Sequence, residues 1–394
     1  MIRAPFSLYV HVPFCAHKCP YCDFNTYAVA RVPEREYVEA VCKELENYRE
    51  DPRFRGRSIT TVFFGGGTPS ILSAEEIRRI LDCARAVFGI RESSELTLEA
   101  NPHDAARAKL EALRAAGVNR LSFGVQSFDD ERLQLLGRDH SSHEAREAIA
   151  LAAEAGFTNI SLDIIFGVPG QTVAQLESDL RQALSLPIQH LSTYSLTIEP
   201  GTPFFQRQAR GLLTMPPDER VAQMLERIPE VARASGFERY EISNFARPGY
   251  ESLHNMVYWS GGDYLGIGAG AHSYCAQHNA AETIESAERW SNLALPASYV
   301  EGVHKGRAVS WRETLDREAL IFEFFYLGMR RTVLGVSRAS FSRLFGGDIP
   351  EKIKQGLEEL ASEGFVAFDD DAIRLTSRGI ALADSVFERL SGGE

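Results

Sequence analysis

The sequence predicts an α/β fold in which parallel strands form an open, partial barrel. Six strand-like runs alternate with helix-like segments over the first two-thirds of the 394 residues. Such alternation is typical of parallel strands joined by right-handed helical crossovers. Six units fall short of the eight of a complete TIM barrel, which leaves an open barrel or a doubly wound sheet. A change of pattern near residue 311 predicts a smaller C-terminal α+β domain.

The elements of the first domain follow from local patterns. Short apolar runs predict strands at 7–12, 59–64, 95–100, 120–125, 159–166 and 189–196. Helical periodicity predicts helices near 34–50, 73–88, 104–116, 141–156, 172–186 and 217–235. Ser73, followed three residues later by Glu76, is typical of a capping box. We assign residues 1–240 to this domain and residues 241–310 to a connecting segment.

Residues 311–394 are predicted to form a winged-helix-like domain. Helical patterns at 315–330, 337–345 and 350–363 precede a hairpin, 366–368 with 373–375, around Asp369-Asp370-Asp371, and a last helix near 377–390. The domain holds eleven basic and fifteen acidic residues. Because phosphate binding requires neutralising cations, we expect this domain to cover the site or dock a partner, and we expect no nucleic acid.

Composition and charge narrow the class of protein. The formal net charge of −12 argues against binding to nucleic acid or to anionic membranes. No apolar run approaches the length that spans a bilayer, and the N-terminus lacks the pattern of a secretory signal. Six cysteines in this length do not indicate a disulfide framework. Cys42 and Cys83 lie in helical patterns and are expected to be buried apolar residues. We expect a cytoplasmic protein.

Cys15, Cys19 and Cys22 follow the first strand with C-x3-C-x2-C spacing. Thiolates select zinc, Cu(I) or iron–sulfur clusters. An iron–sulfur cluster held by three thiolates keeps one iron open to a small molecule, because a [4Fe–4S] cluster normally takes four. A zinc site would need a fourth ligand, such as His11 or His17. A thiol redox pair, Cys19 with Cys22, is a third interpretation, although it leaves Cys15 unused. The spacing alone favours the iron–sulfur cluster without excluding the others.

Polar residues gather where the predicted strands end. The second strand runs into Gly65-Gly66-Gly67-Thr68-Pro69, and Glu99, Gln126 and Asp163 lie at or near the ends of the next three. Parallel α/β folds place their sites at the carboxyl ends of strands, so these residues are expected to converge above the cysteine loop. The glycines allow close approach of a ligand, although a tight turn explains them equally well.

Longer strings resemble a known family. LYVHVPFCAHKCPYCDF, FFGGGTPSIL, LEANP, NRLSFGVQSFDDERLQLLGRDH, DIIFGVPGQT, HLSTYSLTIEPGTPF and HNMVYW are together similar to the oxygen-independent coproporphyrinogen III oxidase-like group of radical S-adenosylmethionine (SAM) proteins, and within it to its heme chaperones. The resemblance covers nearly the whole chain. It implies a partial (β/α)6 radical SAM barrel, a [4Fe–4S] cluster on Cys15, Cys19 and Cys22, and SAM on the fourth iron.

The resemblance also implies roles for particular residues. Positions that match the family's SAM-binding residues are Tyr9, Tyr21, Gly66, Gly67, Thr68, Glu99, Gln126, Arg138 and Asp163. An acidic residue suits the SAM ammonium or ribose hydroxyls, and arginine suits its carboxylate. Taken by itself, Arg138 would be interpreted as a surface helix arginine.

His254 begins the H-N-x-x-Y-W segment, which the resemblance associates with heme. Taken alone, the residues favour a hydrogen-bonded structural histidine, whereas the resemblance predicts that His254 ligates heme iron with support from Asn255 and Tyr258. His272 is the rival ligand.

One departure separates the two branches of the family. The oxidase has a further cysteine two positions after the third, where this chain has Phe24, and it carries a longer N-terminal arm. The expected function is therefore a heme chaperone that passes heme to an acceptor protein, with an electron donor required if SAM is cleaved. The alternatives are oxidative decarboxylation of coproporphyrinogen III or modification of another tetrapyrrole.

Overall fold

The main sheet of this computed structural model, which describes residues 5–369 and 371–391, is built around seven parallel strands. Their spatial order is β11, β1, β4, β5, β6, β7 and β8. Their bounds are β11 (Tyr264–Ile267), β1 (Phe6–Val12), β4 (Ile59–Gly66), β5 (Ile90–Ala100), β6 (Arg120–Gln126), β7 (Ile160–Phe166) and β8 (His190–Ser195). The six strands expected from the sequence are confirmed, and they run side by side in chain order.

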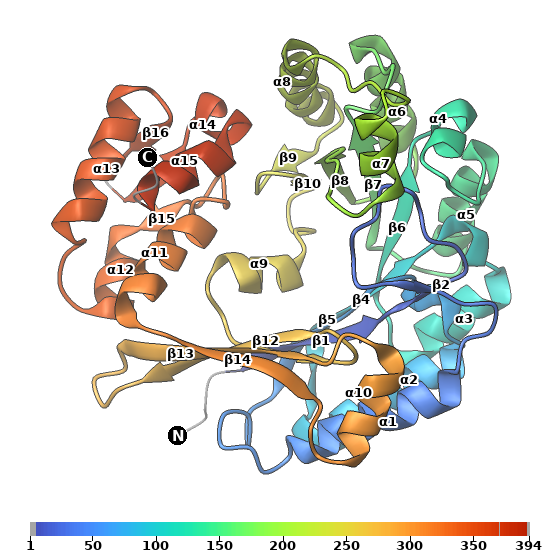
Figure 1. Cartoon of the computed structure of the whole chain (residues 1–394), viewed down its shortest axis with the longest axis horizontal. Coiled ribbons are helices and arrows are strands. Elements are labelled where there is room, and N and C mark those ends of the chain that lie inside the picture. The colour runs from blue at the N-terminus through green and yellow to red at the C-terminus, as the bar shows by residue number, and fades with distance from the viewer. Residues whose placement is uncertain (1–4, 370, 392–394) are drawn as a thin grey trace.

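Antiparallel strands extend both ends of the sheet to twelve strands. Beyond β11 lie β12 (His272–His278), β13 (Ile284–Asn292) and β14 (Val309–Leu315), and beyond β8 lie β10 (Asn244–Ala246) and β9 (Glu238–Arg239). The terminal strands β14 and β9 do not pair with each other within the described residues, so the sheet is an open, partial barrel. In Figure 1 the sheet curves around the short helix α9 (Leu253–Trp259).

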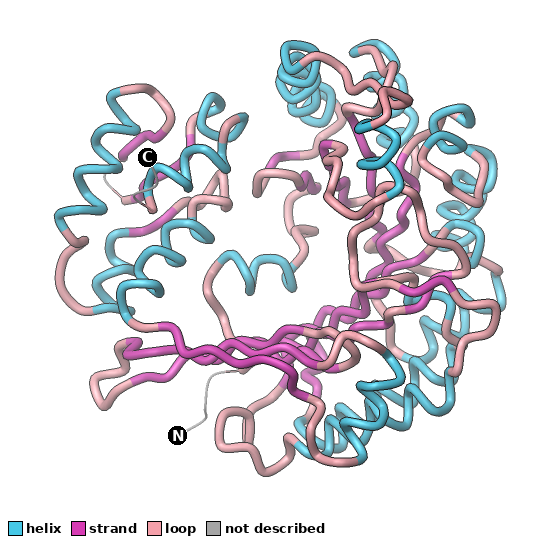
Figure 2. The backbone as a smooth tube through the Cα atoms, viewed as in Figure 1, coloured by secondary structure: helices cyan, strands magenta, loops and turns pink. Residues whose placement is uncertain are grey.

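Helices cover the outer face of the parallel strands (Figure 2). They are α1 (Glu34–Asn47), α2 (Ala74–Phe88), α3 (Arg107–Ala116), α5 (Ser142–Glu154), α6 (Val173–Ser185) and α8 (Asp218–Ala234). The shorter helices η1 (Pro69–Ile71), η2 (Pro102–Asp104), α4 (Asp130–Leu135) and α7 (Pro203–Ala209) lie in the segments that follow β4, β5, β6 and β8. The six predicted crossover helices are confirmed. Ser73 accepts from the Glu76 N–H, but its own N–H donates to Glu34, so it caps α2 without a reciprocal bond from Glu76.

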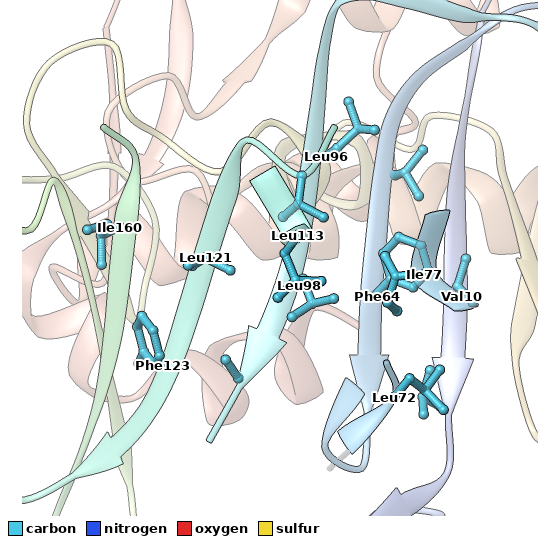
Figure 3. Packing of buried hydrophobic residues seen from close by; sticks show 14 of the residues in the cluster. Val10, Phe64, Leu72, Ile77, Leu96, Leu98, Leu113, Leu121, Phe123 and Ile160 are labelled. Atoms are coloured by element: carbon cyan, nitrogen blue, oxygen red, sulfur yellow. The ribbon is translucent and has the colours of Figure 1, made fainter. Parts of the chain in front are cut away.

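The main core lies between the sheet and these helices. Val10, Phe64, Leu98 and Leu121, from four successive strands of the sheet, are fully buried. Figure 3 shows how such side chains pack against one another. This burial explains why the strands appear in the sequence as nearly continuous apolar runs, as buried parallel strands do.

Residues 241–310, expected to be a connecting segment, contribute strands β10 to β13, helix α9, helix α10 (Pro296–His304) and the start of β14. A buried carboxylate fastens this segment to α1. Glu44 accepts hydrogen bonds from Tyr299 Oη at 2.6 Å, Asn292 Nδ2 at 2.7 Å and the Gly268 N–H at 3.0 Å. The segment is therefore integrated with the sheet. The boundaries 1–240, 241–310 and 311–394 stay a division predicted from the sequence.

One of the two cysteines expected to be buried and apolar departs from that expectation. Cys42 on α1 is buried, but Cys83 on α2 is half-buried, and their Sγ atoms lie 2.7 Å apart. The hydrogen bond from one thiol to the other lowers the pKa of Cys83 to about 7. Cys83 is therefore more than an inert apolar residue, because the thiolate is the reactive form.

The C-terminal region folds around its own small sheet, in the order β15 (Val336–Ser337), β17 (Ala372–Leu375) and β16 (Val366–Phe368). Its helices are α11 (Arg317–Gly328), α12 (Arg338–Phe345), α13 (Glu351–Ser362), α14 (Ser377–Ala381) and α15 (Ala383–Leu390). The predicted three helices and hairpin are confirmed, and the last predicted helix is divided at Leu382. Asp370, predicted within the hairpin turn, lies outside the described residues. Phe325 belongs to a separate core that also includes Ala287 of β13.

No helix within residues 5–369 and 371–391 combines the length and the apolar character that crossing a membrane requires.

Candidate functional site

A cavity of about 510 Å³ lies at the carboxyl ends of the parallel strands. Residues from the loop after β1 and from the ends of β4 to β8 line it. We call it the first cavity. Its position follows the rule for parallel α/β folds, in which the loops after the strands build the site.

The three cysteines of the C-x3-C-x2-C motif all line the first cavity. Cys15 ends the short strand β2 (Phe14–Cys15), which pairs with β3 (Tyr27–Ala28) and so closes the loop that carries Cys19 and Cys22. All three are free and half-buried. Three free thiols on one cavity fit a cluster that keeps one iron open.

Polar contacts surround these sulfur atoms. Thr68 Oγ1 donates to Cys15 Sγ at 3.4 Å, and Arg138 Nη1 donates to Cys19 Sγ at 3.5 Å. Burial raises the pKa of Cys15, and the Thr68 hydrogen bond partly offsets it. A hydroxyl and a guanidinium both favour the thiolate, which is the form that binds metal.

The two histidines considered as a fourth zinc ligand lie in different places. His11 is buried outside the first cavity, with Nδ1 bonded to Tyr9 Oη and Nε2 to the Asn25 carbonyl, both at 3.0 Å. His17 lines the first cavity. Within the described part of the chain, no three His, Cys, Asp or Glu side chains are grouped to hold a single metal ion.

Close packing requires glycine in the loop that follows β4. Gly66 has φ +110°, and a Cβ there would lie 2.4 Å from the His11 ring. A Cβ on Gly67 would lie 2.6 Å from the Phe14 carbonyl. The Gly66 N–H donates to Glu99 Oε2 at 3.2 Å. Glycine is therefore needed to bring the loop against the cysteine strand, and the same approach exposes its backbone to a ligand.

Two carboxyl groups face the first cavity from β5 and β7. Burial and the nearby Asp163 raise the pKa of Glu99 to about 8. Burial likewise raises the pKa of Asp163 to about 6, against the opposing effect of a hydrogen bond from Ser192. A cation or a hydroxyl group that binds beside a desolvated carboxylate stabilises its charge. Shifted pKa values of this kind cluster at functional sites.

Gln126 and Arg138 carry unsatisfied polar atoms in the same cavity. Gln126 has φ +73°, rare for a residue other than glycine, and its buried Oε1 has no partner. Arg138 donates Nη2 to the Gly124 carbonyl at 2.7 Å, while its buried Nε has no partner. Strained backbone and orphaned buried groups are both typical of ligand sites.

The structure therefore brings eight of the nine predicted SAM-binding residues to one cavity: Tyr21, Gly66, Gly67, Thr68, Glu99, Gln126, Arg138 and Asp163. Tyr9 lies elsewhere, beside Phe63 and His11. Sequence reasoning missed Ser195, which ends β8, and Leu196, Thr197 and Glu199, which follow it; all four line the first cavity. The carboxyl-end rule, applied to the sixth strand, would have found them.

A second cavity of about 740 Å³ adjoins the first and shares Phe24, Gly66 and Glu99 with it. Its aromatic walls are Tyr9, Tyr258, Trp259, Tyr264, Tyr274 and Tyr326. It lies between the main sheet, α9 and α11, and this combination was not foreseen from the sequence.

His254 is buried behind this second cavity, and both of its ring nitrogens are engaged. Nδ1 lies 2.7 Å from Thr61 Oγ1, and Nε2 lies 2.8 Å from Tyr258 Oη. Because Thr61 donates its proton to Ser7, His254 Nδ1–H donates to Thr61 and Nε2 accepts from Tyr258. Burial, with a smaller effect of Arg120, lowers the pKa of His254 to about 3.

This arrangement differs from the heme role predicted for His254. The lone pair that iron would need is occupied by the Tyr258 hydroxyl, so ligation by His254 requires Tyr258 to move. Asn255 lines neither cavity, whereas Tyr258 lines the second. The carboxylate of Glu95 holds the N-terminus of α9, because it accepts hydrogen bonds from the N–H groups of Leu253 and His254.

Comparison with known proteins shows full-length relatives. The radical SAM superfamily matches residues 9–183, and the HemN C-terminal domain matches residues 315–382. The heme chaperone HemW of Bacillus subtilis is 39% identical over 98% of this chain and 99% of its own length. That of Escherichia coli is 35% identical over 98% and 97%. The solved structure of the Escherichia coli coproporphyrinogen III oxidase HemN, a radical SAM enzyme, superposes with a TM-score of 0.81 at 25% identity, covering 98% of this chain and 90% of that one.

Proposed function

Because the chain belongs to the HemW family of radical SAM proteins, we propose that it binds heme and passes it to an acceptor protein. The observation that carries this proposal is the full-length similarity to heme chaperones, combined with three free cysteines on one cavity. We assign the protein to the cytoplasm, since its cysteine usage fits a reducing compartment.

Cys15, Cys19 and Cys22 hold a [4Fe–4S] cluster in this proposal. Three thiolates would leave one iron free for SAM. When bound, the cluster and SAM together supply one-electron chemistry at the sulfonium, for which an electron donor is needed. Arg138 stabilises the Cys19 thiolate through its contact at 3.5 Å.

The walls of the first cavity match the functional groups of SAM. Glu99 and Asp163 are buried acids suited to an ammonium or to ribose hydroxyls. The partnerless Oε1 of Gln126 accepts a hydrogen bond, and the partnerless Nε of Arg138 donates one, as a carboxylate requires. Gly66, Gly67 and Thr68 line the same cavity and bring the backbone close to the ligand.

Heme belongs beside this site rather than within it. The second cavity adjoins the first, is walled by aromatic rings and reaches the H-N-x-x-Y-W segment through Tyr258. The first cavity already contains the cysteines. The acceptor protein is expected to approach near α11, which forms one side of the second cavity. We propose no role in binding nucleic acid.

A coproporphyrinogen III oxidase is the second candidate, because HemN has the same fold along nearly the whole chain. Phe24 argues against it. The oxidase branch of the family has a cysteine at this position. In this chain the position is an exposed phenylalanine that lines both cavities.

Heme titration of anaerobically reconstituted protein tests the proposal. We expect a saturable Soret shift, followed by transfer of the heme to an apo-heme protein on mixing. Coproporphyrinogen III, added with SAM and a reductant, should not be converted to protoporphyrinogen IX. No Soret shift would contradict the chaperone function, and rapid conversion would favour the oxidase.

A further inference from the structure

We propose that heme occupies the second cavity and that His272, not His254, is its axial ligand. This inference rests on the proposed function and names the site of that function.

His272 is the accessible imidazole of the second cavity. It opens strand β12, is exposed and lines the cavity. Neither ring nitrogen has a hydrogen-bond partner among the residues that the structure describes, and the nearest ring is that of Trp311 at 6.4 Å. His11, the other histidine of this cavity, has both nitrogens engaged. An imidazole with a free lone pair is a common axial ligand of heme iron.

The walls of the second cavity suit a flat, largely apolar macrocycle. Tyr264 stacks with Tyr274 at a ring distance of 6.1 Å, and Tyr258 meets Tyr264 edge-on at 4.7 Å. The buried indole N–H of Trp259 has no hydrogen-bond partner. Aromatic rings with a few polar atoms among them are typical of cofactor cavities, which span roughly 300–1,000 Å³. The cavity, about 740 Å³, lies within that range.

Charges around the second cavity orient the propionates toward its opening. Arg289 is the one arginine or lysine among the described residues that line it. Arg289 already pairs with Glu313 at 3.2 Å and with Glu323. Because Glu313 and Glu323 already neutralise Arg289, the propionates are better placed in solvent. The apolar part of the ring then lies inside, with iron facing His272.

His254 acts as a positioning residue in this arrangement. Its Nε2 holds the Tyr258 hydroxyl at 2.8 Å, and this bond sets the Tyr258 ring in the cavity wall. Loss of His254 frees Tyr258 and leaves its buried hydroxyl unpaired. The H-N-x-x-Y-W segment thus shapes the heme site without donating the ligand.

The test is heme titration of the full-length, cluster-loaded protein, read by Soret absorbance and by electron paramagnetic resonance of ferric heme. His272→Ala should weaken heme binding by at least about tenfold. It should also remove the spectral features of imidazole-ligated ferric heme, here called the imidazole signature, and added imidazole should restore them. His278→Ala is the matched control, an exposed histidine on the same strand that does not line the cavity. It should behave as the wild type. His254→Ala should weaken binding while keeping the imidazole signature.

The outcomes separate this inference from the proposed function. Wild-type spectra in His272→Ala, with the signature lost in His254→Ala, overturn the assignment of His272 and leave the chaperone function intact. Absence of saturable heme binding by the wild type overturns the chaperone function itself. The iron content of each variant, measured before heme is added, shows whether its cluster is intact.

Discussion

Asp179 on α6 anchors the loop that follows β6, directly after Gln126. Its fully buried carboxylate accepts from Ser127 Oγ at 2.8 Å, the Phe128 N–H at 3.0 Å and Arg132 Nη2 at 3.3 Å. We predict that Asp179→Ala destabilises the protein strongly and also weakens SAM binding, because the loop that Asp179 anchors begins at Ser127, directly after Gln126.

The contacts set the size of the effect. Breaking a buried ion pair by removing one partner costs about 3–5 kcal/mol, and a buried N–H left unpaired costs about 1–3 kcal/mol. Two features reduce the sum: Arg132 keeps Asp129 as a second partner at 3.3 Å, and burial raises the pKa of Asp179, which makes its ionisation unfavourable. We therefore expect a loss of about 4 kcal/mol in the free energy of unfolding.

Urea unfolding followed by circular dichroism measures this loss. Glu177→Ala is the matched control, because Glu177 lies on the same helix and pairs with Arg181 and Arg227 at the solvent-screened surface. Replacing both partners of the buried pair, Asp179→Leu with Arg132→Met, should recover much of the stability. A loss in Asp179→Ala no larger than that of Glu177→Ala would refute the reasoning.

Three further predictions concern other buried groups. Burial raises the pKa of Glu44 to about 7, above its usual 4.5, so the folded state keeps a proton that the unfolded chain has lost. Stability should fall by up to about 3 kcal/mol as pH rises from 5 to 8, and urea titrations of Glu44→Gln should lack this slope. Iodoacetamide should modify Cys83 before Cys42 or Cys275, as peptide mass spectrometry would show, and equal rates would contradict the lowered pKa of Cys83. Arg138→Met should reduce SAM affinity about 10- to 100-fold in equilibrium dialysis, because a charge-assisted hydrogen bond is lost; unchanged affinity would exclude a SAM contact.

The sequence predicts the strands and helices of the barrel well because their patterns are local. A buried parallel strand such as β4 is a nearly continuous apolar run, and each crossover helix has an apolar face toward the core and a polar face toward solvent. The four-residue strand β11 has no such signal, since its place beside β1 is set by pairing with residues more than 250 positions earlier. The antiparallel extension β12–β14 follows from that pairing.

The part of the candidate site that lies at the ends of the parallel strands could be predicted from the sequence. Glu99, Gln126 and Asp163 converge because parallel strands bring their carboxyl ends together, which a sequence pattern can anticipate. The environment of His254 depends on Thr61 from β4, and this contact between distant segments has no sequence signature. For the same reason, a free imidazole at His272 and an engaged one at His254 are distinguished by the fold alone.

The most direct test of the central claim is electron paramagnetic resonance of the anaerobically reconstituted, reduced protein with and without SAM. About four irons per chain and a reduced-cluster signal that changes when SAM is added are the predicted result, since SAM would bind the iron that Cys15, Cys19 and Cys22 leave free. A signal indifferent to SAM, or a preparation that holds zinc in place of iron, would contradict the account.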